Sequence, residues 1–155
     1  MYEYLVAPPL ALTLVWEDGR LASISLEWSG GRPRRAPSTE AGGRLLDALR
    51  DYVDGRACRW PDLPLAWERL TPFQEKILRA LAATEAGRTL TYGELAARCG
   101  SPGAARAVGR VMATNPWPLV VPCHRVVGSS GLTGFGPGLA MKQWLLGLER
   151  DLASR

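Results

Sequence analysis

The sequence predicts a mixed α/β (α+β) fold in which a small antiparallel sheet with one helix precedes a mostly helical second part. Two apolar, β-branched runs joined by Asp18-Gly19 indicate the sheet, and capped segments of helical periodicity dominate after Thr71. Pro61 and Pro64 favour an extended linker between the two parts. We therefore expect two domains, residues 1–66 and residues 67–155.

The first part is predicted to be a hairpin followed by a helix. Residues 10–17 and 20–27 are the two strands, and an Asp-Gly pair between such runs is the usual signal of a type I′ turn. Residues 29–39 form a basic loop rich in Pro and Gly. A helix over residues 40–54 follows, and Gly55 ends it. One side of this helix is apolar, through Leu45, Leu49, Tyr52 and Val53.

The second part carries clear helix start signals. Thr71, with a proline next and Gln74 three residues on, is a capping box, and Thr91 with Glu94 is another. Gly100 ends the helix that begins at the second box, and the next helix is expected to start at Ser101-Pro102 and to stop before Asn115-Pro116.

These two short helices predict a helix-turn-helix. The second of them, residues 103–113, carries small residues that would let its backbone approach another surface closely, while Arg106 and Arg110 project from one side. An αα-hairpin that only packs within the core would give the same pattern, so the motif alone leaves both interpretations open.

Residues 120–127 place Cys123, His124 and Arg125 side by side behind a short apolar run, and His124 is the chain's one histidine. A thiolate is the strongest side-chain nucleophile, and a nearby imidazole commonly lowers the thiol pKa, so we expect a reactive cysteine with a depressed pKa. We expect Leu119–Val121 to end a buried strand, which Pro122 cannot extend. Neighbours on an extended segment point to opposite sides, so His124 should not reach the sulfur directly. A structural cysteine in a buried strand is the alternative.

Composition narrows the class of protein. The chain has three scattered cysteines, Cys58, Cys99 and Cys123, and one histidine. This set predicts neither a disulfide framework nor a metal site. No apolar stretch reaches the ~20 residues that span a bilayer, and the first residues lack the pattern of a secretion signal. We expect a cytoplasmic protein without a membrane partner. A net charge of +4 fits a polyanionic partner, although many ordinary surfaces carry as much.

Six ordered sequence blocks between Thr71 and Glu149 resemble the O6-alkylguanine-DNA alkyltransferases. The first 70 residues match that family only loosely. The blocks are Thr71-Pro72-Phe73-Gln74, Thr91-Tyr92-Gly93-Glu94-Leu95-Ala96, Ala104-Ala105-Arg106-Ala107-Val108-Gly109, Asn115-Pro116, Pro122-Cys123-His124-Arg125-Val126 and Lys142-Gln143-Trp144-Leu145-Leu146.

The resemblance implies a ribonuclease H-like N-terminal domain and a winged-helix-like DNA-binding domain that carries the active cysteine. It implies a monomer without cofactor that moves the alkyl group of O6-alkylguanine, and more weakly of O4-alkylthymine, from duplex DNA to its own cysteine. Such a protein enters the minor groove, flips the base, reacts once, and is nucleoid-associated when bound to DNA.

The resemblance also assigns roles to residues. Cys123 is the nucleophile, His124 acts on it through a water, Glu149 orients the imidazole and Asn115 is a hinge. Arg106 takes the place of the flipped base, and Tyr92 crowds the phosphate. The implied DNA contacts are Arg106, Tyr92, Ala105, Thr91, Arg125 and Ser129, and the implied substrate pocket is formed by Tyr92, Met112, Val126, Phe135 and Gly134.

Two departures from the family pattern stand out. The loop 134–138 is about one residue shorter than in some relatives, and its Phe135 stands where a tyrosine is frequent. The Phe135 ring has no hydroxyl, so it cannot donate a hydrogen bond to the departing base. Ala113 stands where some relatives carry a positive charge, and Arg110 could compensate for the missing charge.

Three other functions are compatible with parts of the sequence pattern. A non-catalytic alkyltransferase-like lesion-binding protein would lack the nucleophile, and Cys123 argues against it. A Cys-His-Glu hydrolase needs a histidine in direct reach of the thiol and an oxyanion hole. A zinc-containing transcription regulator would need a further domain, for which 155 residues leave no room.

Overall fold

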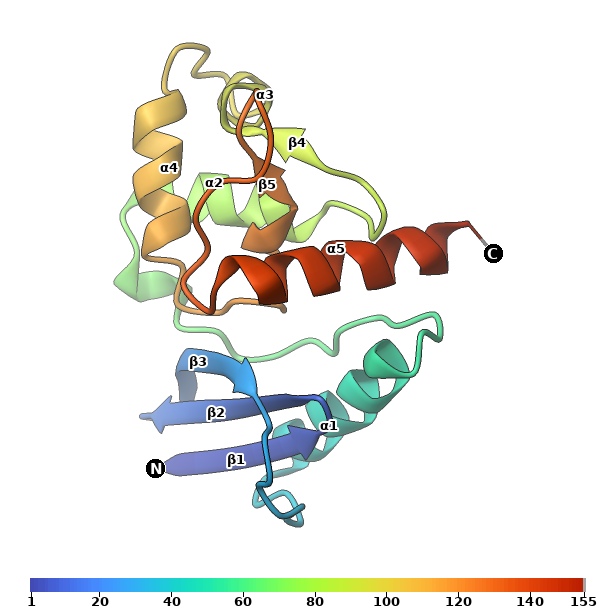
Figure 1. Ribbon diagram of the computed structural model, residues 1–155. Helices are drawn as coiled ribbons and strands as arrows, with labels where there is room; N and C mark the ends of the chain where they lie inside the picture. The colour runs from blue at the N-terminus through green and yellow to red at the C-terminus, as the bar shows by residue number, and fades with distance from the viewer. Residues whose placement is uncertain (155) are drawn as a thin grey trace. The chain divides into compact units, whose positions relative to one another are not determined.

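A computed structural model describes residues 1–154, which divide into two compact units. The N-terminal unit is Met1–Ala66, and the C-terminal unit begins at Trp67. The predicted mixed α/β class is confirmed, because one unit is a sheet with a helix and the other is mostly helical (Figure 1).

The N-terminal unit is a three-stranded antiparallel sheet in the order β1-β2-β3, with strands Tyr2–Ala7, Leu10–Glu17 and Arg20–Trp28. The predicted type I′ turn is confirmed, because Asp18 and Gly19 have φ of 51° and 74°. Strand β1 was not predicted. Exposed and buried positions alternate at its start, but the first buried position is the charged Glu3, which is only 1% exposed.

Helix α1, Glu40–Val53, begins at the N-cap Thr39, whose hydroxyl accepts from the N–H of Gly42. Glu3 reinforces this start, because its carboxylate accepts hydrogen bonds from the backbone and hydroxyl of Thr39 and from Trp16. Burial would raise the pKa of Glu3, but these bonds hold it below its usual range. The buried face of α1 matches the predicted apolar side at Leu45, Leu49 and Tyr52, with Leu46 added, whereas the predicted Val53 is only partly buried.

The C-terminal unit packs four helices around a very small parallel sheet. Both predicted capping boxes are confirmed, at Thr71 and at Thr91. The helices are α2 (Pro72–Ala82), α3 (Tyr92–Arg98), α4 (Ala105–Ala113) and α5 (Leu139–Ala153), and the paired strands are β4 (Leu90–Thr91) and β5 (Val126–Val127). Two short 3-10 segments complete the unit, η1 (Trp67–Arg69) and η2 (Cys123–Arg125).

Two local predictions are wrong. Helix α4 begins at Ala105, not at Ser101 or Gly103, because Gly103 takes a left-handed φ of 93° that no α-helix continues. Residues 119–121 do not form a strand either, since Leu119 has φ of 79°. Cys123 therefore precedes the short strand β5 and does not follow a core strand.

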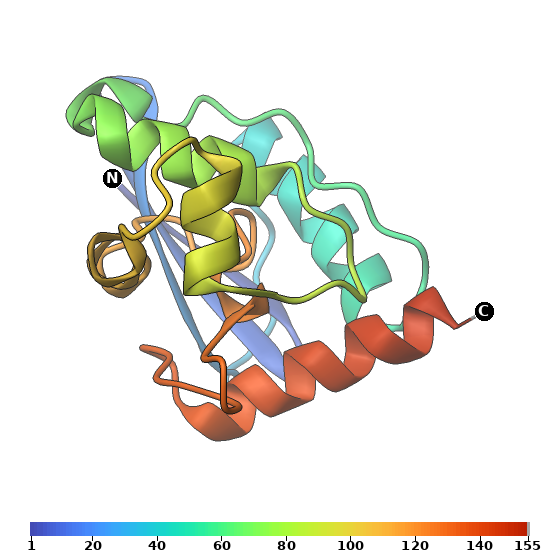
Figure 2. The ribbon, with the colours of Figure 1, turned by 90° about the horizontal axis from the view of Figure 1, so that it is seen from above.

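The arrangement brings α4 beside the loop 128–138 that leads into α5, as the view from above shows (Figure 2). None of the helices among the described residues is long and apolar enough to cross a membrane.

Candidate active site

Asn115 fixes the turn that joins α4 to the cysteine segment. Its side-chain amide donates to the carbonyl of Val121 at 2.9 Å, and its carbonyl oxygen accepts from the N–H of Trp117 at 3.0 Å. The amide therefore ties the end of α4 to the backbone two residues before Cys123.

Cys123 lies in η2 with its side chain turned toward a pocket, and it is 8% exposed. Burial raises the pKa of its thiol, while a hydrogen bond from Asn115 and the charge of Lys142 act in the opposite direction. The expectation of a depressed thiol pKa is therefore wrong for the protein without DNA. The sequence pattern showed the imidazole next to the thiol but not the depth of burial.

Behind the cysteine, a buried carboxylate joins two basic side chains. Glu149 of α5 places Oε2 2.6 Å from Nε2 of His124, and its Oε1 accepts from Nε of Arg125 at 2.8 Å. All three side chains are nearly excluded from solvent. Burial would raise the pKa of Glu149, but the hydrogen bonds and charges of His124 and Arg125 lower it to about 2.

The other nitrogen of the imidazole is unoccupied by protein groups. Nδ1 of His124 is buried and has no hydrogen-bond partner among residues 1–154. Because the Glu149 bond holds the ring by Nε2, Nδ1 is the nitrogen left to exchange a proton.

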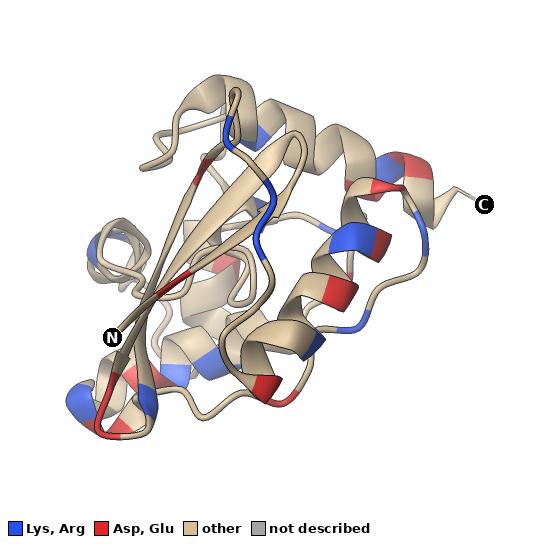
Figure 3. Ribbon diagram, turned by 90° about the horizontal axis from the view of Figure 1, so that it is seen from below, with Lys and Arg blue, Asp and Glu red and all other residues tan. Residues whose placement is uncertain are grey.

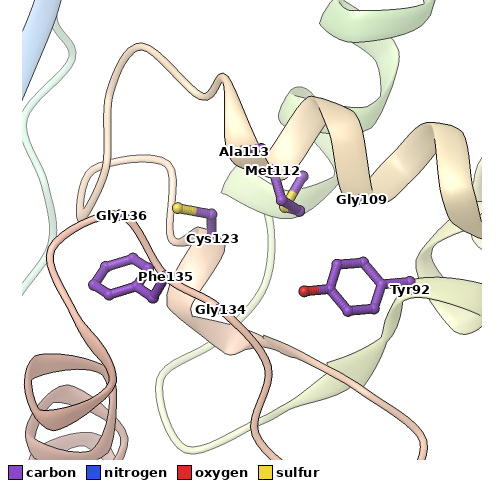
Figure 4. A pocket seen from close by; sticks show the side chains of 8 residues that line it. All are labelled: Tyr92, Gly109, Met112, Ala113, Cys123, Gly134, Phe135 and Gly136. Carbon is purple, nitrogen blue, oxygen red and sulfur yellow. The ribbon is translucent and has the colours of Figure 1, made fainter.

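A pocket of about 380 Å³ opens above the thiol (Figure 4). Tyr92 enters from one side with its hydroxyl directed inward, and Cys123 and Phe135 lie opposite (Figure 4). The phenyl ring of Phe135 also stands edge-on to the His124 ring, with centroids 6.3 Å apart. The lining residues are Tyr92, Gly109, Met112, Ala113, Cys123, Gly134, Phe135 and Gly136.

Four of the five predicted pocket residues line this space. Val126 does not, because it is fully buried below the pocket, where its carbonyl accepts from Nζ of Lys142 at 2.7 Å. Sequence reasoning missed Lys142, which is 1% exposed. Its place on the apolar side of α5 was the available signal. Sequence reasoning also left out of the pocket three small residues that line it, Gly109, Ala113 and Gly136.

Of the six residues predicted to face DNA, Tyr92 lines the pocket, and the other five fall into two groups. Arg106 and Ser129 are exposed, Ala105 is the first residue of α4, and Thr91 caps α3. Arg125 is different. It is 6% exposed and donates to Glu149 and to the backbone carbonyl and hydroxyl of Thr84, so its assignment as a DNA contact is withdrawn.

Charge differs between the two units. From residue 67 onward the sequence has eleven Lys and Arg against six Asp and Glu, whereas residues 1–66 have eight against nine. In the N-terminal unit, acidic and basic positions alternate along α1, as the view from below shows (Figure 3). The net positive charge thus belongs to the unit that contains the pocket. Among the described residues, no group of His, Cys, Asp and Glu could hold a metal ion.

The chain is similar to known proteins over nearly its whole length. Residues 72–151 match the family model of the 6-O-methylguanine DNA methyltransferase, DNA binding domain. A methylated-DNA–protein-cysteine methyltransferase of Salmonella typhimurium is 39% identical, over 94% of each chain. One of Mycolicibacterium paratuberculosis is 41% identical, over 96% of this chain and 92% of the relative.

Solved structures give the same result. The crystal structure of Mycobacterium tuberculosis OGT in complex with DNA is 36% identical, covers 97% of this chain and 93% of its own, and superposes with a TM-score of 0.80. The O6-methylguanine-DNA methyltransferase of Pyrococcus kodakaraensis is 25% identical with a TM-score of 0.63, and the match covers 95% and 96% of the two chains.

Proposed function

Because the chain belongs to the 6-O-methylguanine DNA methyltransferase family, we propose that it repairs DNA by direct reversal, moving an alkyl group from O6-alkylguanine onto its own Cys123. The observation that carries the proposal is a cysteine facing a pocket, with a buried His124–Glu149 pair directly behind it. O4-alkylthymine is a weaker substrate on this account.

The reaction needs a thiolate, and burial opposes one. The proton of Cys123 therefore passes to Nδ1 of His124 through a bridging water, and Glu149 stabilises the imidazolium that forms. The sulfur then attacks the alkyl carbon, the S–C bond forms as the C–O6 bond breaks, and guanine departs with the electron pair. A thioether is not readily hydrolysed, so each molecule reacts once.

The substrate base must leave the DNA stack. The O6 group of a stacked guanine lies in the major groove beside its partner base, whereas Cys123 is 8% exposed and lies within a pocket. Only an extrahelical nucleotide can bring its alkyl carbon to the sulfur.

Helix α4 is proposed to enter the minor groove. Small residues at Ala105 and Gly109 allow close approach of its backbone, and the exposed Arg106 fills the space that the flipped base leaves. Thr91, Tyr92 and Ser129 contact the backbone of the same nucleotide region. We propose that the protein acts as a monomer in the cytoplasm, with the N-terminal unit as structural support.

A pair of variants separates chemistry from binding. Cys123→Ser should abolish methyl transfer and retain binding to methylated duplex, whereas Arg106→Ala should weaken both. Arg150→Ala, an equal loss of charge at an exposed position of α5, is the control and should leave both near wild type. Transfer by Cys123→Ser, or equal DNA binding by Arg106→Ala and wild type, would contradict the proposal.

A further inference from the structure

The loop between β5 and α5, residues 128–138, forms one wall of the pocket through Gly134, Phe135 and Gly136. Its backbone hydrogen bonds are largely internal. Gly128 and Gly131 exchange two of them, and the N–H of Gly138 donates to the carbonyl of Phe135. Such bonds shape the loop but do not fix it against the helices on the other side of the pocket.

Thr133 connects the loop to neighbouring helices through two of its groups, and its methyl group packs within the loop. Its hydroxyl oxygen lies 2.6 Å from the Tyr92 hydroxyl, and its carbonyl accepts from Nζ of Lys142 at 3.3 Å. Its methyl group packs on Gly128, where an added Cβ would come within 2.6 Å. One residue thus joins the loop to α3 and to α5.

The Tyr92 ring faces Gly109 of α4, where an added Cβ would lie 3.9 Å from the ring. Among the side chains that line the pocket, only Tyr92 carries a hydroxyl, because Phe135 presents a bare ring. The orientation of this one O–H therefore decides whether a side-chain hydroxyl of the pocket can donate to a base.

We propose that Thr133 is a positioning residue for alkyl transfer, an inference that rests on the function proposed above. The Thr133 hydroxyl donates to the oxygen of Tyr92 and turns the phenol O–H toward the base in the pocket. As the C–O6 bond breaks, the departing guanine carries developing negative charge, which a donated hydrogen bond stabilises. A phenol that accepts one hydrogen bond donates a second more strongly. The base then takes up a proton from water.

The test uses Thr133→Val, which keeps the methyl group and the carbonyl but removes the hydroxyl, and Thr133→Ser, which keeps the hydroxyl. Single-turnover transfer from an O6-methylguanine duplex is measured over a range of DNA concentrations. Thr133→Val should lower the saturating rate about fivefold, the effect of one neutral hydrogen bond, with little change in the half-saturating DNA concentration. Thr133→Ser should react at nearly the wild-type rate.

The decisive comparison adds Tyr92→Phe. If Thr133 acts through the phenol, Thr133→Val should slow the Tyr92→Phe protein no further. An equal slowing in both backgrounds, a wild-type saturating rate for Thr133→Val, or failure of Thr133→Ser to restore the rate would overturn the inference. Rates are taken well below the melting temperature of the least stable variant. A wild-type protein that transfers nothing would instead refute the proposed function.

Discussion

Replacing Glu149 by Gln should lower the free energy of unfolding near neutral pH and should make that free energy fall less as the pH is lowered. Glu149 is 1% exposed, and its bonds to His124 and Arg125 lower its pKa from 4.5 to about 2. A folded-state pKa below the unfolded one stabilises the protein above the unfolded value, and the stabilisation is lost as pH falls through the folded value. Through this pKa difference, Glu149 contributes roughly 3 kcal/mol to the free energy of unfolding at neutral pH and about 1.4 kcal/mol at pH 3.

The assay is urea unfolding of wild type and Glu149→Gln between pH 7 and pH 3. The difference in unfolding free energy should be largest at pH 7 and shrink by about 2 kcal/mol at pH 3. Glu75→Gln is the matched control, because Glu75 pairs with Arg79 on the exposed side of α2 and such pairs contribute about 0.5 kcal/mol. An acid sensitivity of Glu149→Gln equal to that of wild type would refute the reasoning.

Two further predictions concern the cysteine and its turn. Alkylation of Cys123 by iodoacetamide in the protein without DNA, followed by peptide mass over a range of pH, reports the apparent pKa of the thiol. This pKa should lie above that of an unfolded cysteine, because burial is the largest influence on it. A lower value would contradict this reasoning. Asn115→Ala should lower the free energy of unfolding by about 1–3 kcal/mol and should slow methyl transfer, because the carbonyl of Val121 and the N–H of Trp117 lose their partner. Unchanged stability and rate would show that the turn does not depend on this amide.

Elements with local chemical signals could be predicted from the sequence. The Asp18-Gly19 turn and the capping boxes at Thr71 and Thr91 are set by neighbouring residues, so their formation needs no knowledge of the fold. Strand β1 could not be predicted in this way, because its buried Glu3 accepts hydrogen bonds from residues distant in the sequence, Trp16, Ser38 and Thr39.

The same distinction holds at the site. The side-by-side Cys123 and His124, and the resemblance that pointed to Glu149, predicted the candidate site, and the structure brings His124 and Glu149 within hydrogen-bond distance. The burial of Arg125 and Lys142 depends on tertiary contacts with Thr84, Val126 and Thr133. The raised pKa of the Cys123 thiol follows from the burial of that thiol in the folded unit. Leu119 has a left-handed backbone that its apolar neighbours gave no reason to expect.

Intact-protein mass with peptide mapping tests the central claim most directly. The protein is incubated with an excess of O6-methylguanine duplex until the reaction stops. The account predicts that each molecule gains one methyl group in place of one proton, found in the peptide that contains Cys123. Continued turnover, or a methyl group on Cys58 or Cys99, would contradict it.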